Sequence, residues 1–345
     1  MSSKIIFLYA EITTYFLSSL KELENSNLYQ IKVVYNSKNE ELINSYEFNN
    51  TLIFPISNFR DKNELLSFCL KYMPKAIFIS GLMSSQYLYV ARKFKGLSKI
   101  ICLYDTIPQK TLIYGLKNIF KKYIYKFYFD YVWGTGSLNV EHAKNIGFND
   151  KQIFSSFYVC DKVFSHKYFD VVKNKGLNIL FIGRLVKEKN ILFLVDTVNK
   201  LIKRNYKIRL TIIGEGPLKS SLEVNQNIVH LGFLSKGEII NIAKRNNLFC
   251  LPSIYEPWGV VVHEMASLGL PLLLSNRCGS SKDLLINYEN GLSFDPMNPC
   301  ELENKLLEIY NYDQAKFSSM SEKSRLVSKK INHQNWLNTL NSILK

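Results

Sequence analysis

The chain has 345 residues, of which 47% are hydrophobic, 13% aromatic and 21% charged, and its formal net charge is +15. The apolar content excludes a disordered chain, and the low counts of Gly and Pro, 16 and 9, exclude a collagen-like or low-complexity protein. The length predicts two domains. The positive excess suggests an anionic partner, such as nucleic acid, a phosphate group or a membrane surface.

The basic residues are uneven in both type and position. Arg supplies only 8 of the 44 basic residues, whereas proteins that contact phosphates and base edges tend to use its planar fork. Residues 91–126 hold nine basic residues and one acid, Asp105, a local excess of +8. This basic patch indicates a localised anionic contact, and the scarcity of Arg argues against a nucleic-acid partner.

Cysteine usage and the length of the apolar runs bear on location. The six Cys residues form no C-x-x-C pair, as is typical of buried free thiols. The first apolar run is too short for a signal peptide, and no run approaches the ~20 apolar residues that cross a bilayer. We therefore expect a cytoplasmic protein whose membrane contact, if any, is peripheral.

Short apolar runs alternate with helix-period segments in the first half of the chain. Helices are expected between most of the runs, for example over 63–72 and 86–94. Strands are expected over residues 5–9, 31–35, 51–54, 76–80, 100–104 and 131–133.

The second half repeats this alternation after a polar stretch near 165–177, and three helical segments follow residue 299. Buried parallel strands with right-handed helical crossovers explain both halves, so we expect an α/β fold of two doubly wound domains with a helical tail. Ligands in such sheets bind at the carboxyl ends of the strands. Strands are expected over 178–182, 208–213, 228–231, 248–251 and 271–275, and helices at about 189–204, 216–224, 236–246 and 259–269.

Two cations follow the first strand of the second half. The segment after this strand contains Gly183 and Arg184, and Lys189 stands just before the next helix. Cations at the carboxyl end of a sheet, beside a helix start, favour a phosphate group. For this segment alone, the alternative is that the two cations are solvated charges beside a turn.

Gly214 and Gly216 close the next strand. Glycines at that position let the backbone approach a ligand or a neighbouring loop. A dinucleotide fingerprint needs a third glycine, which this segment lacks. A plain tight turn explains the pair about as well as a ligand does.

Two carboxylates flank the start of the helix expected over 259–269. Glu256 leaves the preceding strand, and Glu264 lies about two turns into the helix. The free N–H groups around Gly259 and Val260 point at an anion, while the carboxylates can accept hydrogen bonds from nearby hydroxyls. This combination suits a nucleotide sugar.

Other chemistries find no support in the sequence. His263 and Glu264 begin an H-E-x-x-H string, but position 267 is Ser, so a zinc-protease site is not expected. The five His residues show no ligand spacing, and a G-x-S-x-G nucleophile elbow is absent. We expect no metal site.

Four motifs in order resemble the family 4 retaining glycosyltransferases over about residues 177–300. They are Gly183-Arg184 with Lys189, Gly214-x-Gly216-Pro217, Glu256 with Glu264 and Gly269-Leu-Pro271, and Gly291-Leu-x-Phe-x-Pro296. The resemblance implies the GT-B fold, in which two Rossmann-like doubly wound domains face each other across a cleft.

The same resemblance implies roles for individual residues. Arg184 and Lys189 would hold the diphosphate of the donor and stabilise the departing nucleoside diphosphate. Glu264 would bind the ribose hydroxyls and Glu256 the donor sugar. The remaining donor-binding residues implied are Gly183, Gly214, Gly216, Gly259, Val260 and Ser280.

The first half resembles the family less closely. The family often has a His-Asp pair after the fifth strand, where this chain has Tyr104-Asp105. Asp105 would serve the acceptor side as a catalytic residue, although an Asp at a strand end is commonly a helix cap. The domains implied are 1–165 for the acceptor, 166–330 for the nucleotide sugar, and a helix at 331–345 that returns to the first domain.

The basic patch includes an amphipathic helix with one aromatic and aliphatic arc. Such a helix can lie on an anionic leaflet, each Lys contributing about 1 kcal/mol. Alternatively, the apolar arc packs on the sheet and the lysines are solvated. The lysines expected to contact lipid are Lys117, Lys121, Lys122 and Lys126.

The predicted function is transfer of a sugar, with retention and without a metal or other cofactor, from a UDP- or GDP-linked donor. The acceptor expected is a glycan or a polyprenyl-linked glycan of cell-surface polysaccharide, as in O-antigen, capsule or lipopolysaccharide synthesis, at the inner face of the membrane. A nucleotide-sugar epimerase or a sugar phosphorylase of the same fold, and a polyanion-binding protein, are the alternatives.

Overall fold

A computed structural model describes residues 3–36, 40–108, 112–165, 167–173 and 176–345, and within these the side chains of all except 112–119 and 299. The chain divides into two compact units. The first comprises residues 1–159 together with 332–345, and the second comprises 160–331. The boundary expected near residue 165 from the polar stretch therefore lies at 159/160.

The first unit is built on a parallel sheet of seven strands in the order β3-β2-β1-β4-β5-β6-β7. Its central strands are continuous apolar runs, and all four residues of β4 are buried, as expected for a sheet covered on both faces. The strands are β1 (Ser3–Tyr9), β2 (Tyr29–Tyr35), β3 (Thr51–Pro55), β4 (Ala76–Ile79), β5 (Lys99–Tyr104), β6 (Tyr131–Gly134) and β7 (Ile153–Phe154).

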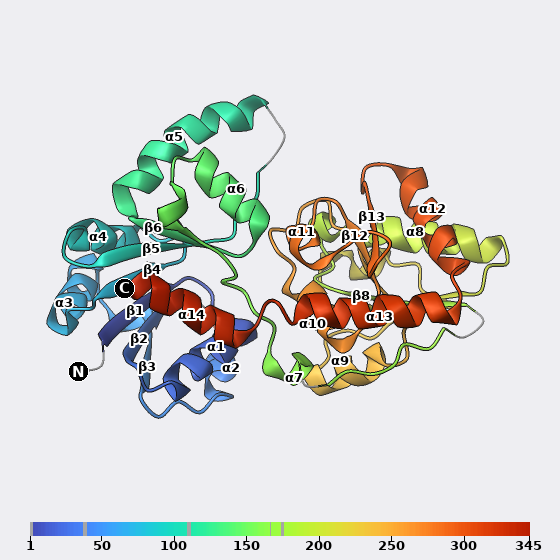
Figure 1. Ribbon diagram of the computed structural model, residues 1–345, viewed down its shortest axis with the longest axis horizontal. Coiled ribbons are helices and arrows are strands. Elements are labelled where there is room, and N and C mark those ends of the chain that lie inside the picture. The colour runs from blue at the N-terminus through green and yellow to red at the C-terminus, as the bar shows by residue number, and fades with distance from the viewer. Residues whose placement is uncertain (1–2, 37–39, 109–111, 166, 174–175) are drawn as a thin grey trace. The chain divides into compact units, whose positions relative to one another are not determined.

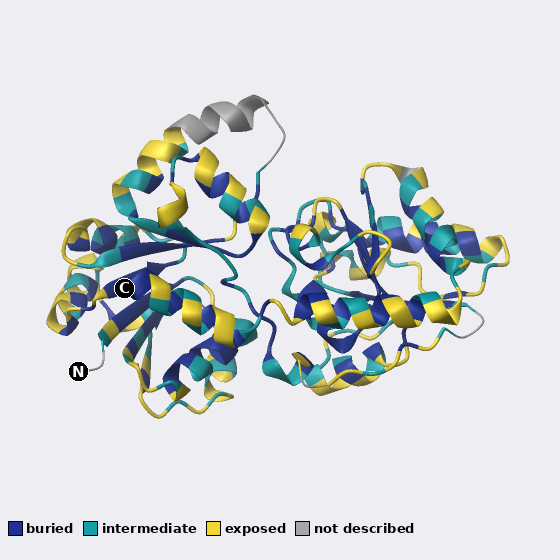
Figure 2. Cartoon of the chain, viewed as in Figure 1, coloured by how far each residue is buried: buried dark blue, intermediate teal, exposed yellow. Residues whose placement is uncertain are grey.

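Helices flank this sheet, with their buried faces toward the strands and their exposed faces outward (Figures 1 and 2). α14 (His333–Leu344) is the last helix of the chain, yet it packs beside α1 (Thr14–Asn25). The Trp336 indole is buried and donates to the Phe157 carbonyl at 2.9 Å. The other helices are α2 (Glu40–Asn44), α3 (Lys62–Tyr72), α4 (Ser85–Phe94), α5 (Leu112–Tyr128) and α6 (Ser137–Asn145).

The second unit has a six-stranded parallel sheet in the order β10-β9-β8-β11-β12-β13. Its strands are β8 (Leu177–Ile182), β9 (Ile208–Ile213), β10 (Ile228–His230), β11 (Leu248–Leu251), β12 (Leu272–Ser275) and β13 (Gly291–Phe294). Its helices are α7 (Lys162–Ser165), α8 (Ile191–Lys203), α9 (Lys236–Ala243), α10 (Val260–Leu268), α11 (Ser281–Leu284), α12 (Pro299–Tyr310) and α13 (Gln314–Ser328).

The expected strands are confirmed, and two further strands, β7 and β13, were not predicted. The helix expected over 216–224 is wrong, because only a short 3-10 helix, Pro217–Ser221, forms there. The Asn225 side chain accepts from the backbone N–H groups of Asn227 and Ile228 and so favours a turn over helix continuation.

Candidate active site

Each sheet reverses its strand order at one point, and ligands of doubly wound folds bind outside the carboxyl ends of the strands there. In the second sheet the reversal lies between β8 and β11, which are adjacent and parallel although β9 and β10 separate them in sequence. The loop after β8 carries Arg184 and Lys189, and the loop after β11 carries Glu256. The sheet order therefore brings together two segments that the sequence keeps apart.

Lys189 and Glu256 form an ion pair across this reversal point, from Lys189 Nζ to Glu256 Oε2. Both side chains are largely buried, with 17% and 8% of their surface exposed. The Ile254 N–H donates to the Glu188 carbonyl at 2.9 Å and joins the two loops directly. A buried charge needs such a partner, so each side chain holds the other in place.

The backbone around Glu256 is fixed from the β12 side. The Gly279 N–H donates to the Glu256 carbonyl at 2.8 Å, and the Ser280 N–H donates to the Trp258 carbonyl at 3.0 Å. A Cβ on Gly279 would lie 1.9 Å from the Pro257 carbonyl oxygen, so only glycine permits this approach. Ser280 itself is fully buried, and its hydroxyl contacts Cys278 Sγ at 3.3 Å.

α10 starts at this position. Gly259 precedes it with φ +82°, and no side chain caps the helix. The first N–H groups of a helix have no intrahelical partner and carry its positive end. The α10 start, with Val260 as its first residue, lies directly after Glu256 and can receive an anionic group.

Gly214 and Gly216 serve contact between loops. A Cβ on Gly214 would lie 2.0 Å from the Gly183 carbonyl oxygen, and one on Gly216 would lie 2.5 Å from that of Leu185. The Leu185 N–H donates to the Glu215 carbonyl at 2.9 Å. The structure shows both glycines in close approach to a neighbouring loop. The donor-binding role that the resemblance implies for them stays a prediction.

Glu264 lies farther along α10, half-buried, near a Lys236–Asp161 ion pair of 2.6 Å. Burial raises the pKa of Glu264 to about 7; Lys236 opposes this shift and Asp161 adds to it. Its carboxyl group therefore gains and loses a proton near neutral pH. Arg184, by contrast, is exposed, and no side-chain hydrogen bond or ion pair holds it within the described residues.

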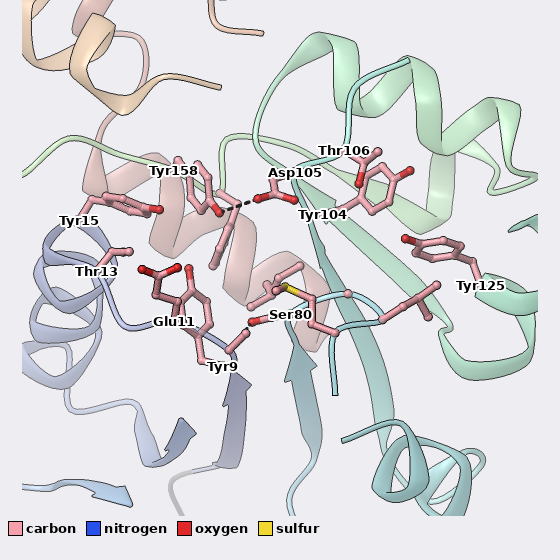
Figure 3. A pocket seen from close by; sticks show the side chains of 16 residues that line it. Tyr9, Glu11, Thr13, Tyr15, Ser80, Tyr104, Asp105, Thr106, Tyr125 and Tyr158 are labelled. Atoms are coloured by element: carbon pink, nitrogen blue, oxygen red, sulfur yellow. Dashed lines mark hydrogen bonds between the residues drawn. The ribbon is translucent and has the colours of Figure 1, made fainter. Parts of the chain in front are cut away.

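A pocket of about 540 Å³ lies in the first unit at its own reversal point, between β1 and β4. Asp105, directly after β5, is one of its lining residues, and the Tyr158 hydroxyl donates to Asp105 Oδ2 at 3.3 Å (Figure 3). Desolvation raises the pKa of Asp105, and the hydrogen bond from Tyr158 lowers it. Asp105 was expected from the sequence, whereas the surrounding tyrosines Tyr9, Tyr15 and Tyr158 were not.

Asp105 is positioned by residues of β5 and α6. Asn139 Nδ2 donates to the Thr106 carbonyl at 2.9 Å, and its Oδ1 accepts from the Gly136 N–H at 3.1 Å. The Tyr104 hydroxyl shares a buried hydrogen bond with His142 Nδ1, and burial lowers the pKa of His142 to about 4, so that this imidazole is neutral. The backbone on both sides of Asp105 is thus anchored.

The aromatic and aliphatic arc of the helix expected in the basic patch could have packed on the sheet. In the part of α5 whose side chains are described, this arc is exposed. Phe120 and Tyr123 are 72% and 71% exposed, and Ile124 and Phe127 are also exposed. Lys122 is exposed and Lys121 half-buried, whereas Lys126 donates to Gln152 Oε1 at 2.8 Å; the Lys117 side chain lies outside the described part. Among the described residues, no helix is long and apolar enough to span a membrane.

Comparison with known proteins finds a family model that matches most of the second unit. Residues 167–327 match the model of the group 1 glycosyl transferases. An uncharacterized glycosyltransferase of Methanocaldococcus jannaschii, MJ1607, is 31% identical over 128 residues, 35% of this chain and 32% of that protein. The capsular polysaccharide biosynthesis glycosyltransferase CapM of Staphylococcus aureus is 24% identical over 166 residues, 46% of this chain and 43% of its own. These matches span less than half of either relative.

Solved structures match over the whole chain and establish the fold. A glycosyltransferase from Rickettsia africae has a TM-score of 0.77 and 16% identity, covering 100% of this chain and 99% of its own. Anabaena HepE, in complex with UDP and glucose, has a TM-score of 0.74 and 14% identity, covering 99% of this chain and 100% of its own. The fold of this protein is therefore GT-B, as expected from its sequence.

Proposed function

We propose that this protein is a glycosyltransferase that moves a sugar from a nucleoside-diphosphate donor to a glycan or polyprenyl-linked glycan, with retention and without a metal or other cofactor. The Lys189–Glu256 ion pair at the reversal point, beside the uncapped start of α10, carries this proposal. The names of the relatives support transfer and do not favour the epimerase.

The chemistry follows from charge. As the bond from the sugar C1 to the phosphate oxygen breaks, its electron pair leaves with the diphosphate and the sugar gains oxocarbenium character. Arg184, Lys189 and the α10 start would stabilise the negative charge on the leaving group. Glu256 would then exchange its bond with Lys189 for donor sugar hydroxyls, and Glu264 would accept from ribose hydroxyls. On the acceptor side, the attacking hydroxyl oxygen forms the new bond to C1 and its proton passes to Asp105.

The names of the relatives support a choice of donor nucleotide and of biosynthetic role. HepE binds UDP and glucose, which supports a UDP-linked donor over a GDP-linked one. CapM acts in capsular polysaccharide biosynthesis, which supports a role in cell-surface polysaccharide such as capsule, O-antigen or lipopolysaccharide. We propose that this work takes place at the inner face of the cell membrane.

The test combines nucleotide binding with turnover. A nucleotide at 100 times its Kd stabilises the folded protein by about 2.7 kcal/mol, so a thermal-shift screen of UDP, GDP, ADP and CDP identifies the base. Arg184→Ala and Lys189→Ala should lower turnover about 10²- to 10³-fold. Arg204→Ala, which removes an exposed cation that pairs with Glu303, is the matched control and should keep the wild-type rate. Wild-type turnover in Arg184→Ala or Glu256→Ala would contradict the assignment.

We also propose that the exposed surface of α5 contacts an anionic leaflet through Phe120, Tyr123, Ile124 and the neighbouring lysines 117, 121, 122 and 126. Aromatic rings beside Lys are typical of interfacial helices. Phe120→Ser with Tyr123→Ser, or Lys122→Glu, should reduce flotation with anionic liposomes several-fold. Lys71→Glu, at an exposed Lys near the end of α3, is the control. Flotation that is absent for the wild type at low salt, or equal in all variants, refutes the contact.

A further inference from the structure

The pocket of the first unit has a charge opposite to that of the chain. Its sixteen lining residues include Glu11 and Asp105 and no Lys, Arg or His, although the chain as a whole carries +15. Among the described residues that line this space, an anionic group would meet two carboxylates and no Lys, Arg or His. Like charges placed together in a partly desolvated site repel each other, so these carboxylates disfavour binding of an anionic group.

Aromatic rings form the wall beside these carboxylates. The rings of Tyr15 and Tyr158 meet edge to face, with centroids 4.7 Å apart, and Tyr9 stacks on Phe16 at 4.0 Å. Figure 3 shows the Tyr158 side chain between Tyr15 and Asp105, with its hydroxyl directed at Asp105. Burial raises the pKa values of Tyr9, Tyr15 and Tyr158, so all three phenols stay protonated as donors.

The walls of the pocket are preorganised. Ser80 Oγ, just after β4, accepts from the Ala10 N–H at 3.0 Å and joins the loops that follow β1 and β4. The Asp105 segment is anchored by Asn139 and Tyr104, as described above. A pre-formed pocket of this volume, apolar-walled with a few converging polar groups, is typical of a site for a small molecule.

We propose that this pocket takes the accepting sugar as a ring without a negative charge, and that Glu11 and Asp105 exclude acceptor sugars that carry a carboxylate or phosphate. The apolar face of the ring packs on Tyr15 and Tyr158, and Asp105 accepts a hydrogen bond from a ring hydroxyl. In a polyprenyl-linked acceptor, the diphosphate lies outside this pocket. This inference rests on the proposed function, since it defines the acceptor of that transfer.

The test measures glycan binding directly, so that it does not depend on turnover. Saturation-transfer NMR of the full chain is recorded with methyl glycosides of glucose, galactose, mannose and N-acetylglucosamine, and with glucuronic and galacturonic acid. At least one neutral glycoside should bind, and the uronic acids should bind at least tenfold more weakly than their neutral counterparts. Glu11→Gln should reduce the ratio of the affinities for neutral glycosides and for uronic acids about five- to tenfold. Glu47→Gln is the control, because it makes an equal charge change at an exposed residue outside the pocket, and it should leave this ratio unchanged.

Variants at Tyr15 separate the ring from the hydroxyl. Tyr15→Ala should weaken binding of the neutral glycoside about tenfold, and Tyr15→Phe, which keeps the ring and preserves folding, should retain most of it. Uronic acids that bind as tightly as neutral glycosides, or a panel in which no neutral glycoside binds, would overturn the inference. The thermal-shift screen with nucleotides tests the proposed function separately, because its failure leaves glycan binding to this unit intact.

Discussion

Glu264 shows how one half-buried residue links the stability of the second unit to pH. An unfolded Glu ionises near its ordinary pKa of 4.5, whereas burial raises the pKa of folded Glu264 to about 7. Between pH 4.5 and pH 7, the folded state therefore binds the Glu264 proton more tightly than the unfolded state does. Its stabilising contribution is fully present below pH 4.5 and is lost as the pH rises through 7.

Glu264→Gln should remove this dependence, because the amide has no proton to lose. We compare the free energy of unfolding of the variant with that of the wild type at each pH. The difference should be about 3 kcal/mol more in favour of the variant at pH 8.5 than at pH 4.5. Urea unfolding at the two pH values measures this gain. Glu322→Gln, at an exposed carboxylate on α13, is the control. A gain that is equal at both pH values, or equal in the control, would show that Glu264 does not ionise in this way.

Loops of the second unit depend on glycine where two backbones touch. Gly214 has φ +130°, and a Cβ there would lie 2.0 Å from the carbonyl oxygen of Gly183, in the loop that carries Arg184. By contrast, a Cβ on Gly237 in α9 would meet nothing within 4 Å. The two glycines lie in the same unit and differ in what surrounds them, so they form a matched pair.

Gly214→Ala should destabilise the protein by at least about 2 kcal/mol and weaken nucleotide binding, since the two loops must move apart. Gly237→Ala should be neutral or stabilise by about 0.5–1 kcal/mol, because Ala is the better helix former. Thermal unfolding with and without UDP measures both effects. If Gly214→Ala keeps the wild-type midpoint and affinity, the contact between these loops is unimportant.

At the scale of the whole molecule, the first unit is discontinuous in sequence. α14 follows the second unit along the chain, yet it completes the core of the first. His333 Nε2 shares a 3.2 Å hydrogen bond with Ser18 Oγ, and the Tyr29 hydroxyl donates to Asn341 Oδ1 at 2.5 Å. Trp336 packs against Trp133, with ring centroids 4.9 Å apart. The second unit, in contrast, is one continuous segment, 160–331.

A fragment of residues 160–331 should therefore fold alone and unfold cooperatively, whereas a fragment of 1–159 should not, because it lacks α14. Trp336→Ala in the full chain should cost the first unit about 3–5 kcal/mol, the usual cost of removing a buried aromatic ring. Circular dichroism and urea unfolding of the fragments and the variant measure these differences. A stable, cooperatively unfolding 1–159 fragment would show that α14 is dispensable.

The sequence by itself determined the elements and the chemistry at their ends. Alternating apolar runs and helix-period segments predicted both sheets, because parallel strands covered on both faces must be continuously apolar. The same sequence placed Arg184, Lys189 and Glu256 after strands, at the edge where ligands bind, and Asp105 at the end of β5. Local errors arose where polar side chains compete with the helix, as at Asn225, or where a strand is very short, as at β7.

The tertiary structure decided which of these groups meet. Lys189 and Glu256 pair because β8 lies next to β11, an order that local periodicity does not encode. The pocket of the first unit forms for the same reason. It is lined by the loops that follow β1, β4 and β5 and by Tyr158, which lies far along the chain. Strand order depends on how whole crossovers pack, so side-chain partners distant in sequence become neighbours only once the sheet is assembled.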